Sequence, residues 1–226
     1  MAKTTFYLYD IHTICSLMET GKIVVPTFQR GFVWAKLQVL NLLRSIYQGY
    51  PIGTIIVFEQ PSKHLEMLTA EEALFPDSEN QSKSHPYVWS VVDGAQRLAA
   101  IYNSFFAKGL KIKVFFDLET EEFLTNPKAK KSGRYIDLHA LYSTEEFFQF
   151  QRVIFSHDSR DILLDKVTNL HRAFKDYQIP VQVLADVSLD DAASIFQRLN
   201  IGGQRLSKSD IQKAMNRKGK TRKKTP

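Results

Sequence analysis

The sequence predicts a mixed fold of the α+β class, and three observations lead to this prediction. Segments with apolar residues at helical spacing alternate with short apolar, β-branched segments along the whole chain. The spacing between these segments is irregular, and the sequence has no internal repeat. The chain has 226 residues, of which 44% are hydrophobic, so it can bury a core without disulfides or a metal. We therefore expect a single domain over residues 1–216 with mixed strand directions.

The N-terminal quarter of the chain predicts two helices and two strands. Glycine or proline ends each of these segments, as expected for residues that break regular structure. In chain order we expect a short amphipathic helix at 10–20, a strand at 23–25, an irregular aromatic segment at 27–36, an amphipathic helix at 37–50 and a strand buried on both faces at 53–60.

The rest of the chain continues the mixture. Residues 60–86 are polar and contain three prolines, which indicates a surface insertion. A helical part is expected over residues 138–177. The remaining elements are a strand at 87–92, a helix at 95–109, a strand at 111–118 followed by a hairpin or flexible loop, a strand at 179–186, a helix at 188–203 capped by Ser188, and a last helix from residue 207.

The positive charge of the chain is concentrated at its end. The net charge is +6, and six basic residues in the segment 217–226 equal this excess, so the rest is neutral overall. Such a basic tail can contact nucleic-acid phosphates without reading sequence, but it can also be a solubilising end or the point where a longer protein is cut. The residues that we expect to contact nucleic acid are Arg217, Lys218, Lys220, Arg222, Lys223 and Lys224.

The single cysteine, Cys15, excludes an intrachain disulfide and a cysteine-based zinc site, which favours a reducing cytoplasmic location. No segment approaches the roughly 20 consecutive apolar residues of a membrane span, and we expect no contact with a membrane.

The turn at residues 93–97 is the first candidate site. An expected strand ends at Asp93, Gly94 permits a positive φ, and Arg97 lies one helical turn further on. Backbone N–H groups at a helix start and a guanidinium suit a phosphate, and Asp93 could hold Mg²⁺ against it. In the alternative interpretation Asp93 caps the helix, Gly94 turns the chain and Arg97 pairs with Asp93.

Two further segments combine an amide with an arginine. Gln29 and Arg30 lie between aromatic residues, which suits a base plus a phosphate or a nucleic-acid backbone. Alternatively, these aromatic residues belong to the core and Arg30 forms a structural ion pair. Arg198 and Asn200 lie where a predicted helix ends before a glycine pair, a position where asparagine is often a simple C-cap.

Four segments in this order resemble one family: PTFQRGFVW, SIYQGYPIGTIIVFE, VVDGAQRL and FQRLNIGGQRLSKSDI. They are similar to the Asp-Gly-Gln-Gln-Arg motif domain at the N-terminus of GmrSD-type, modification-dependent (type IV) restriction proteins. The resemblance covers about residues 8–216. It implies a fold like that of ParB and sulfiredoxin, with a mixed sheet and a helical C-terminal part. It also implies binding of a nucleoside triphosphate, hydrolysis with a divalent metal in several members, and recognition or cutting of modified phage DNA.

The resemblance also implies roles for individual residues. The nucleotide would be ATP or GTP with Mg²⁺, and Asp93 would hold the metal. One position departs from the family pattern, because Ala95 stands where an amide is usual. The implied catalytic residues are Asp93, Gln96 and Arg97, and the implied nucleotide-binding residues are Gln29, Arg30, Gly94, Arg97, Arg198 and Asn200.

The leading hypothesis is therefore a nucleoside-triphosphate-binding module, and a candidate NTPase, of an anti-phage restriction or DNA-processing system. A non-enzymatic ParB-like adaptor that binds DNA is the alternative. A third hypothesis is a nuclease whose metal lies between Asp93 and either Glu59 or Asp117. The chain has no paired histidines at nuclease-like spacing, so a nuclease domain is not expected here. If DNA is cut, a separate nuclease subunit or a missing C-terminal part would have to supply the nuclease.

Overall fold

The computed structural model describes residues 3–26, 31–62, 84–106, 113–125, 127, 133–187, 191, 194, 195 and 198. Several predictions fall outside these ranges. They are the site residues Gln29, Arg30 and Asn200, the basic tail at 217–226, the last helix, most of the insertion at 60–86 and Ser188 with most of its helix.

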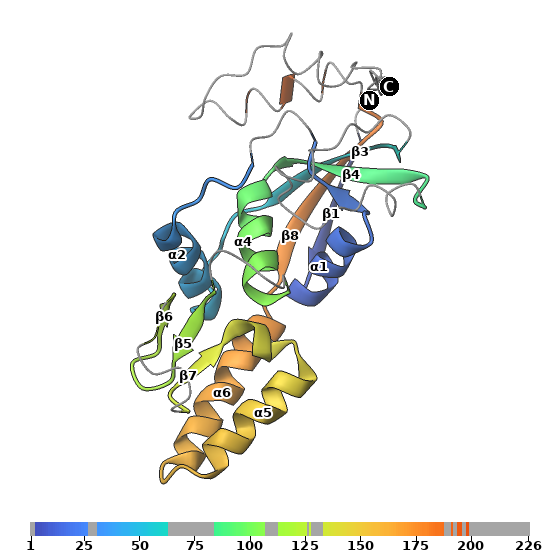
Figure 1. The fold of residues 1–226 in the computed structure, drawn as a ribbon. Coiled ribbons are helices and arrows are strands. Elements are labelled where there is room, and N and C mark those ends of the chain that lie inside the picture. The colour runs from blue at the N-terminus through green and yellow to red at the C-terminus, as the bar shows by residue number, and fades with distance from the viewer. Residues whose placement is uncertain are drawn as a thin grey trace, which may run out of the picture.

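A mixed five-stranded sheet forms the larger layer (Figure 1). Its strand order is β1 (Lys3–Tyr9), β8 (Ile179–Ala185), β3 (Ile55–Pro61), β4 (Tyr87–Asp93) and β2 (Ile23–Val24). β1 and β8 are antiparallel, as are β3 and β4, whereas β8 and β3 are parallel, as are β4 and β2. The prediction of an α+β fold with mixed strand directions is confirmed, although the sequence analysis did not predict β1.

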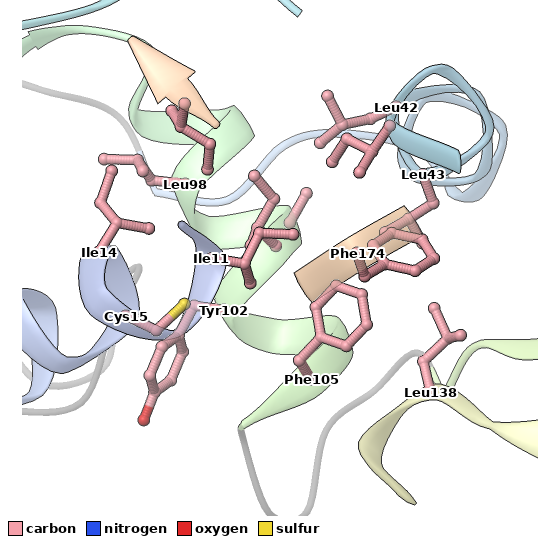
Figure 2. Close-up of a cluster of buried hydrophobic side chains, with 14 of the residues drawn as sticks. Ile11, Ile14, Cys15, Leu42, Leu43, Leu98, Tyr102, Phe105, Leu138 and Phe174 are labelled. Atoms are coloured by element: carbon pink, nitrogen blue, oxygen red, sulfur yellow. The ribbon is translucent and has the colours of Figure 1, made fainter. Parts of the chain in front are cut away.

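Three helices belong to the same half of the fold: α1 (Ile11–Glu19), α2 (Lys36–Tyr47) and α4 (Ala95–Phe105). Figure 1 shows α1 and α4 lying against one face of the sheet. The Asp10 carboxylate caps α1 by accepting a hydrogen bond from the Thr13 amide at 2.7 Å. The apolar faces of these helices pack into the core that Figure 2 shows, where Ile11, Ile14, Leu43, Leu98 and Phe105 are fully or almost fully buried.

A second, smaller layer follows α4 in the chain. It contains a three-stranded antiparallel sheet in the order β6 (Glu122–Leu124), β5 (Phe115–Asp117), β7 (Tyr135–Asp137). The 3₁₀ helix η2 (Leu138–Leu141) leads into α5 (Thr144–Phe155) and α6 (Arg160–Lys175), which confirms the predicted helical part. Phe174 of α6 reaches the same core as Phe105, with ring centroids 4.9 Å apart, so one hydrophobic core joins the two layers.

Polar side chains also fasten the smaller layer to the helices. The Tyr47 hydroxyl of α2 donates to Glu121 at 3.0 Å, and Lys166 of α6 pairs with the same carboxylate at 3.2 Å. Burial, together with Glu121, raises the pKa of Tyr47 to about 12. None of the described helices is both long and apolar enough to cross a membrane.

Candidate functional site

The predicted strand–turn–helix lies where β4 passes into α4. Asp93 is the last residue of β4, Gly94 is the N-cap residue with φ +95°, and α4 begins at Ala95. A Cβ atom on Gly94 would lie 2.4 Å from Cδ1 of Ile55, so the turn needs glycine for space as well as for its backbone angle. The turn therefore places the half-exposed carboxylate of Asp93 directly before the buried first residue of α4, Ala95.

The guanidinium of Arg97 joins this turn to the segment before β3. Its Nη1 donates to the Ile52 carbonyl at 2.7 Å, and its Nη2 donates to the Thr54 carbonyl at 3.2 Å and to Oδ2 of Asp93 at 2.7 Å. The Arg97 side chain is 15% exposed, whereas that of Asp93 is 43% exposed. The Asp93–Arg97 ion pair of the alternative interpretation is thus formed. Of its two side chains, Asp93 is the more exposed to solvent.

Gly53 makes room for this guanidinium. Its φ is +83°, and a Cβ atom at this position would lie only 2.6 Å from Nη1 of Arg97. Any side chain at residue 53 would therefore have to displace either the turn or the guanidinium. Residues 51–53 belong to the segment SIYQGYPIGTIIVFE that resembles the family, but that resemblance did not predict that their backbone holds the arginine.

Gln96 binds a third segment. Its Nε2 donates to the Gly31 carbonyl at 3.0 Å, and its Oε1 accepts from the Val33 amide at 3.0 Å. The nitrogen and the oxygen of the Gln96 side-chain amide thus both bind the backbone of residues 31–33, which directly follow Arg30 in the sequence. The geometry assigns Gln96 a positioning role, and its expected contact with a phosphate or a water stays a prediction.

Three of the four segments that the sequence analysis singled out therefore meet at the start of α4. The contacts link residues 31–33, 52–54 and 93–97. Of the fourth segment the structure describes Arg198, which is helical and exposed. Ala95 is 4% exposed and belongs to the core, so its methyl group does not face a ligand at the surface of the turn.

The two-acid metal site considered for a nuclease does not form. Glu59 pairs with Trp89 in the β3–β4 register and accepts from its indole at 3.0 Å, which places it about 13 Å along the strand from Asp93. Asp117 lies in the smaller sheet, toward the C-terminal end of α4 in Figure 1, and pairs with Arg134 at 2.6 Å. Asp93 is therefore not joined by either of the expected acids.

The donor set at the turn limits the kind of cation that could bind. The described residues contain no group of three or more His, Cys, Asp or Glu side chains that could hold a metal ion. Mg²⁺ often binds proteins through one or two carboxylates while phosphates and waters complete its shell. The single exposed carboxylate of Asp93 fits a cation shared with a phosphate, and it does not fit a closed protein site.

Two comparisons relate this chain to known proteins. The family model of the GmrSD restriction endonuclease, N-terminal domain, matches residues 11–216. A curated protein of Methanocaldococcus jannaschii, "Uncharacterized protein MJ0686", is 23% identical to this chain. That alignment covers 84% of the chain but only 38% of the relative, so the chain spans less than half of the relative's length. Since the family model covers most of its residues, the chain belongs to the family of GmrSD restriction endonuclease N-terminal domains.

Proposed function

We propose that this chain is the nucleoside-triphosphate-binding module of a modification-dependent anti-phage restriction system. The nucleotide would bind where residues 31–33, 52–54 and 93–97 meet, with its phosphates beside Arg97 and the start of α4. The membership in the restriction family and the arrangement of this turn support the proposal together.

The observation that carries the proposal is the fixed guanidinium of Arg97. Two backbone carbonyls and a carboxylate orient it, so little side-chain entropy is lost when it binds an anion. A guanidinium that is 15% exposed also interacts with a phosphate more strongly than a fully solvated one would. The backbone N–H groups at the start of α4 would add donors on the same side of the turn.

A bound divalent cation, Mg²⁺ in the simplest case, would neutralise phosphate charge, and Asp93 is the residue that would hold it. Gln96 would keep residues 31–33 in place beside the nucleotide. Hydrolysis is a further step of the proposal, in which Asp93 orients the attacking water. A turnover assay follows once binding has been measured.

The test of this proposal is calorimetric titration with ATP and with GTP, each with Mg²⁺, on the wild-type protein and on Arg97→Ala. We expect wild-type binding and a loss of about tenfold to hundredfold in affinity in the variant, because a charge-assisted hydrogen bond is removed. Arg44→Ala is the matched control, since Arg44 also lies in a helix and pairs with an acid, Glu122, away from the turn.

Circular dichroism and a thermal melt establish whether Arg97→Ala remains folded, because its side chain also holds residues 52 and 54. Wild-type protein that binds neither nucleotide would refute the proposal. If Arg97→Ala is folded and binds nucleotide as tightly as Arg44→Ala does, the nucleotide site does not lie at this turn.

DNA is the second partner that we propose. The six basic residues of the tail at 217–226 equal the net charge excess of the chain and would contact the phosphate backbone. Cutting of modified DNA would come from a nuclease outside these 226 residues, in the same protein or in a separate subunit. The competing proposal is a non-enzymatic, ParB-like DNA-binding adaptor in which the polar groups at this turn are only structural, and nucleotide binding at Arg97 distinguishes the two.

A further inference from the structure

The bonds of the Arg97 guanidinium differ in how easily they can be replaced. Nη2 carries two hydrogens, and its bonds to the Thr54 carbonyl and to the Asp93 carboxylate use both of them. The Thr54 carbonyl belongs to the backbone of the segment that leads into β3, so it is fixed by the fold. The Asp93 carboxylate is at the end of a rotatable side chain and is 43% exposed.

The other side of the guanidinium is held in place. Nη1 bonds to the Ile52 carbonyl at 2.7 Å, and the Cβ-free face of Gly53 lies directly against Nη1. The guanidinium therefore cannot move away from Asp93 to meet a ligand without breaking backbone contacts. A ligand that is to bind Nη2 has to take the place of the carboxylate.

We propose that a phosphate and the Asp93 carboxylate compete for Nη2 of Arg97, so that the Asp93–Arg97 ion pair opens when the phosphate binds Nη2. This inference rests on the proposed nucleotide site and adds a regulatory property to it. Opening releases the Asp93 carboxylate, which then faces solvent beside the bound phosphate. A divalent cation that binds the released carboxylate and the phosphate together stabilises the open state, which couples metal binding to phosphate binding.

The inference makes an unusual prediction for Asp93→Asn. If the carboxylate only helps to bind the ligand, removing its charge weakens binding. If it competes for Arg97, the variant binds metal-free triphosphate more tightly than the wild-type protein does. We expect a gain of about fivefold to tenfold for inorganic triphosphate and for ATP without metal, and a much smaller effect of Mg²⁺ than in the wild type.

A general change in net charge could also raise the affinity for an anion. Glu122→Gln is the matched control, because it removes one negative charge from another exposed ion pair, with Arg44 of α2. It should leave the affinity for triphosphate within about twofold of the wild type. An equal gain in Glu122→Gln and Asp93→Asn would overturn the inference.

Simple repulsion between Asp93 and a phosphate is distinguished by a double-mutant cycle with Arg97→Ala. Competition for Arg97 requires that the gain of Asp93→Asn disappears in the Arg97→Ala background. Repulsion acts without Arg97, so a gain of the same size in that background would overturn the inference.

Two glycines provide a second test if Arg97→Ala does not fold. Gly53→Ala pushes the guanidinium out of its place while its charge is kept, whereas Gly49 has φ +70° with nothing within 4 Å of its Cβ position. Gly49→Ala thus carries similar backbone strain without the collision. The gain of Asp93→Asn should vanish when it is combined with Gly53→Ala and should remain with Gly49→Ala, and its persistence in both would contradict the inference.

The results also separate this inference from the proposed function. Wild-type protein that binds Mg²⁺–nucleotide without any gain in Asp93→Asn refutes the competition alone. If Asp93→Asn binds triphosphate through Arg97 and the wild-type protein does not bind it, the nucleotide function is refuted and the competition is supported. Absence of triphosphate binding in both proteins refutes both.

Discussion

Two of the aspartate–arginine pairs in the described part of the chain, Asp117–Arg134 and Asp93–Arg97, are built in opposite ways. In the smaller sheet, the Asp117 side chain is 6% exposed and Arg134 is 34% exposed. At the turn before α4, the arginine is the buried member, with 15% exposure for Arg97 and 43% for Asp93. Both pairs have short contacts, 2.6 Å and 2.7 Å, so the distance alone does not distinguish them.

The hydrogen-bond partners of Asp117 show that its ion pair has a structural role. Asp117 accepts from Nε and Nη2 of Arg134 and from the amides of Glu119 and Thr120. Burial opposes ionisation of this carboxyl, but the hydrogen bonds from Arg134, Glu119 and Thr120 hold the pKa of Asp117 below its usual range. A carboxylate with so many protein partners stabilises its turn, whereas an exposed acid against a fixed guanidinium remains open to a ligand.

The largest expected difference between the two pairs is in stability. Asp117→Asn should lower the free energy of unfolding by about 2–4 kcal/mol, because it removes the negative charge beside Arg134 and replaces one of the two acceptor oxygens by an NH2 group that faces a donor. Asp93→Asn should cost less than about 1 kcal/mol, because the Asp93 carboxylate is exposed. Urea denaturation of both variants, followed by circular dichroism, gives the two values. Equal losses would mean that both pairs are structural.

A smaller effect is expected from Gln96→Ala. The variant loses the two bonds to Gly31 and Val33, so we expect a cost of about 1–2 kcal/mol and faster hydrogen exchange at the Val33 amide. Gln149→Ala is the control, because Gln149 makes an exposed bond to Glu145 within α5. Unchanged exchange at Val33 would show that Gln96 does not hold this segment in solution.

The sequence predicted most of the elements because their signals are local. Gly94 between an apolar strand and an amphipathic helix was enough to predict the turn, and the helical part after residue 138 followed from its spacing. β1 was missed although its residues Thr4–Tyr9 are β-branched, aromatic or leucine, which favours a strand. What residue types do not reveal is its partner, β8, because the Lys3–Ala185 pair joins residues 182 positions apart in the sequence.

The candidate site was only partly predictable for a similar reason. The residues Asp93, Gly94 and Arg97 could be found from their type and spacing, because phosphate chemistry needs such groups near a helix start. The carbonyls of Ile52 and Thr54 that hold Arg97 belong to the backbone, and every residue has one. Only the fold determines which carbonyls meet the guanidinium, and residue types alone do not reveal this.

Nucleotide binding at Arg97 can be observed directly by NMR, with Arg134 as an internal reference in the same titration. The Nε–Hε signals of Arg97 and Arg134 are recorded while Mg²⁺–ATP, and then Mg²⁺–GTP, is added to the wild-type protein. We expect a saturable shift of the Arg97 signal with at least one nucleotide and no shift for Arg134, whose partner Asp117 is buried. An unchanged Arg97 signal at saturating nucleotide, or equal shifts of both signals, would contradict nucleotide binding at Arg97.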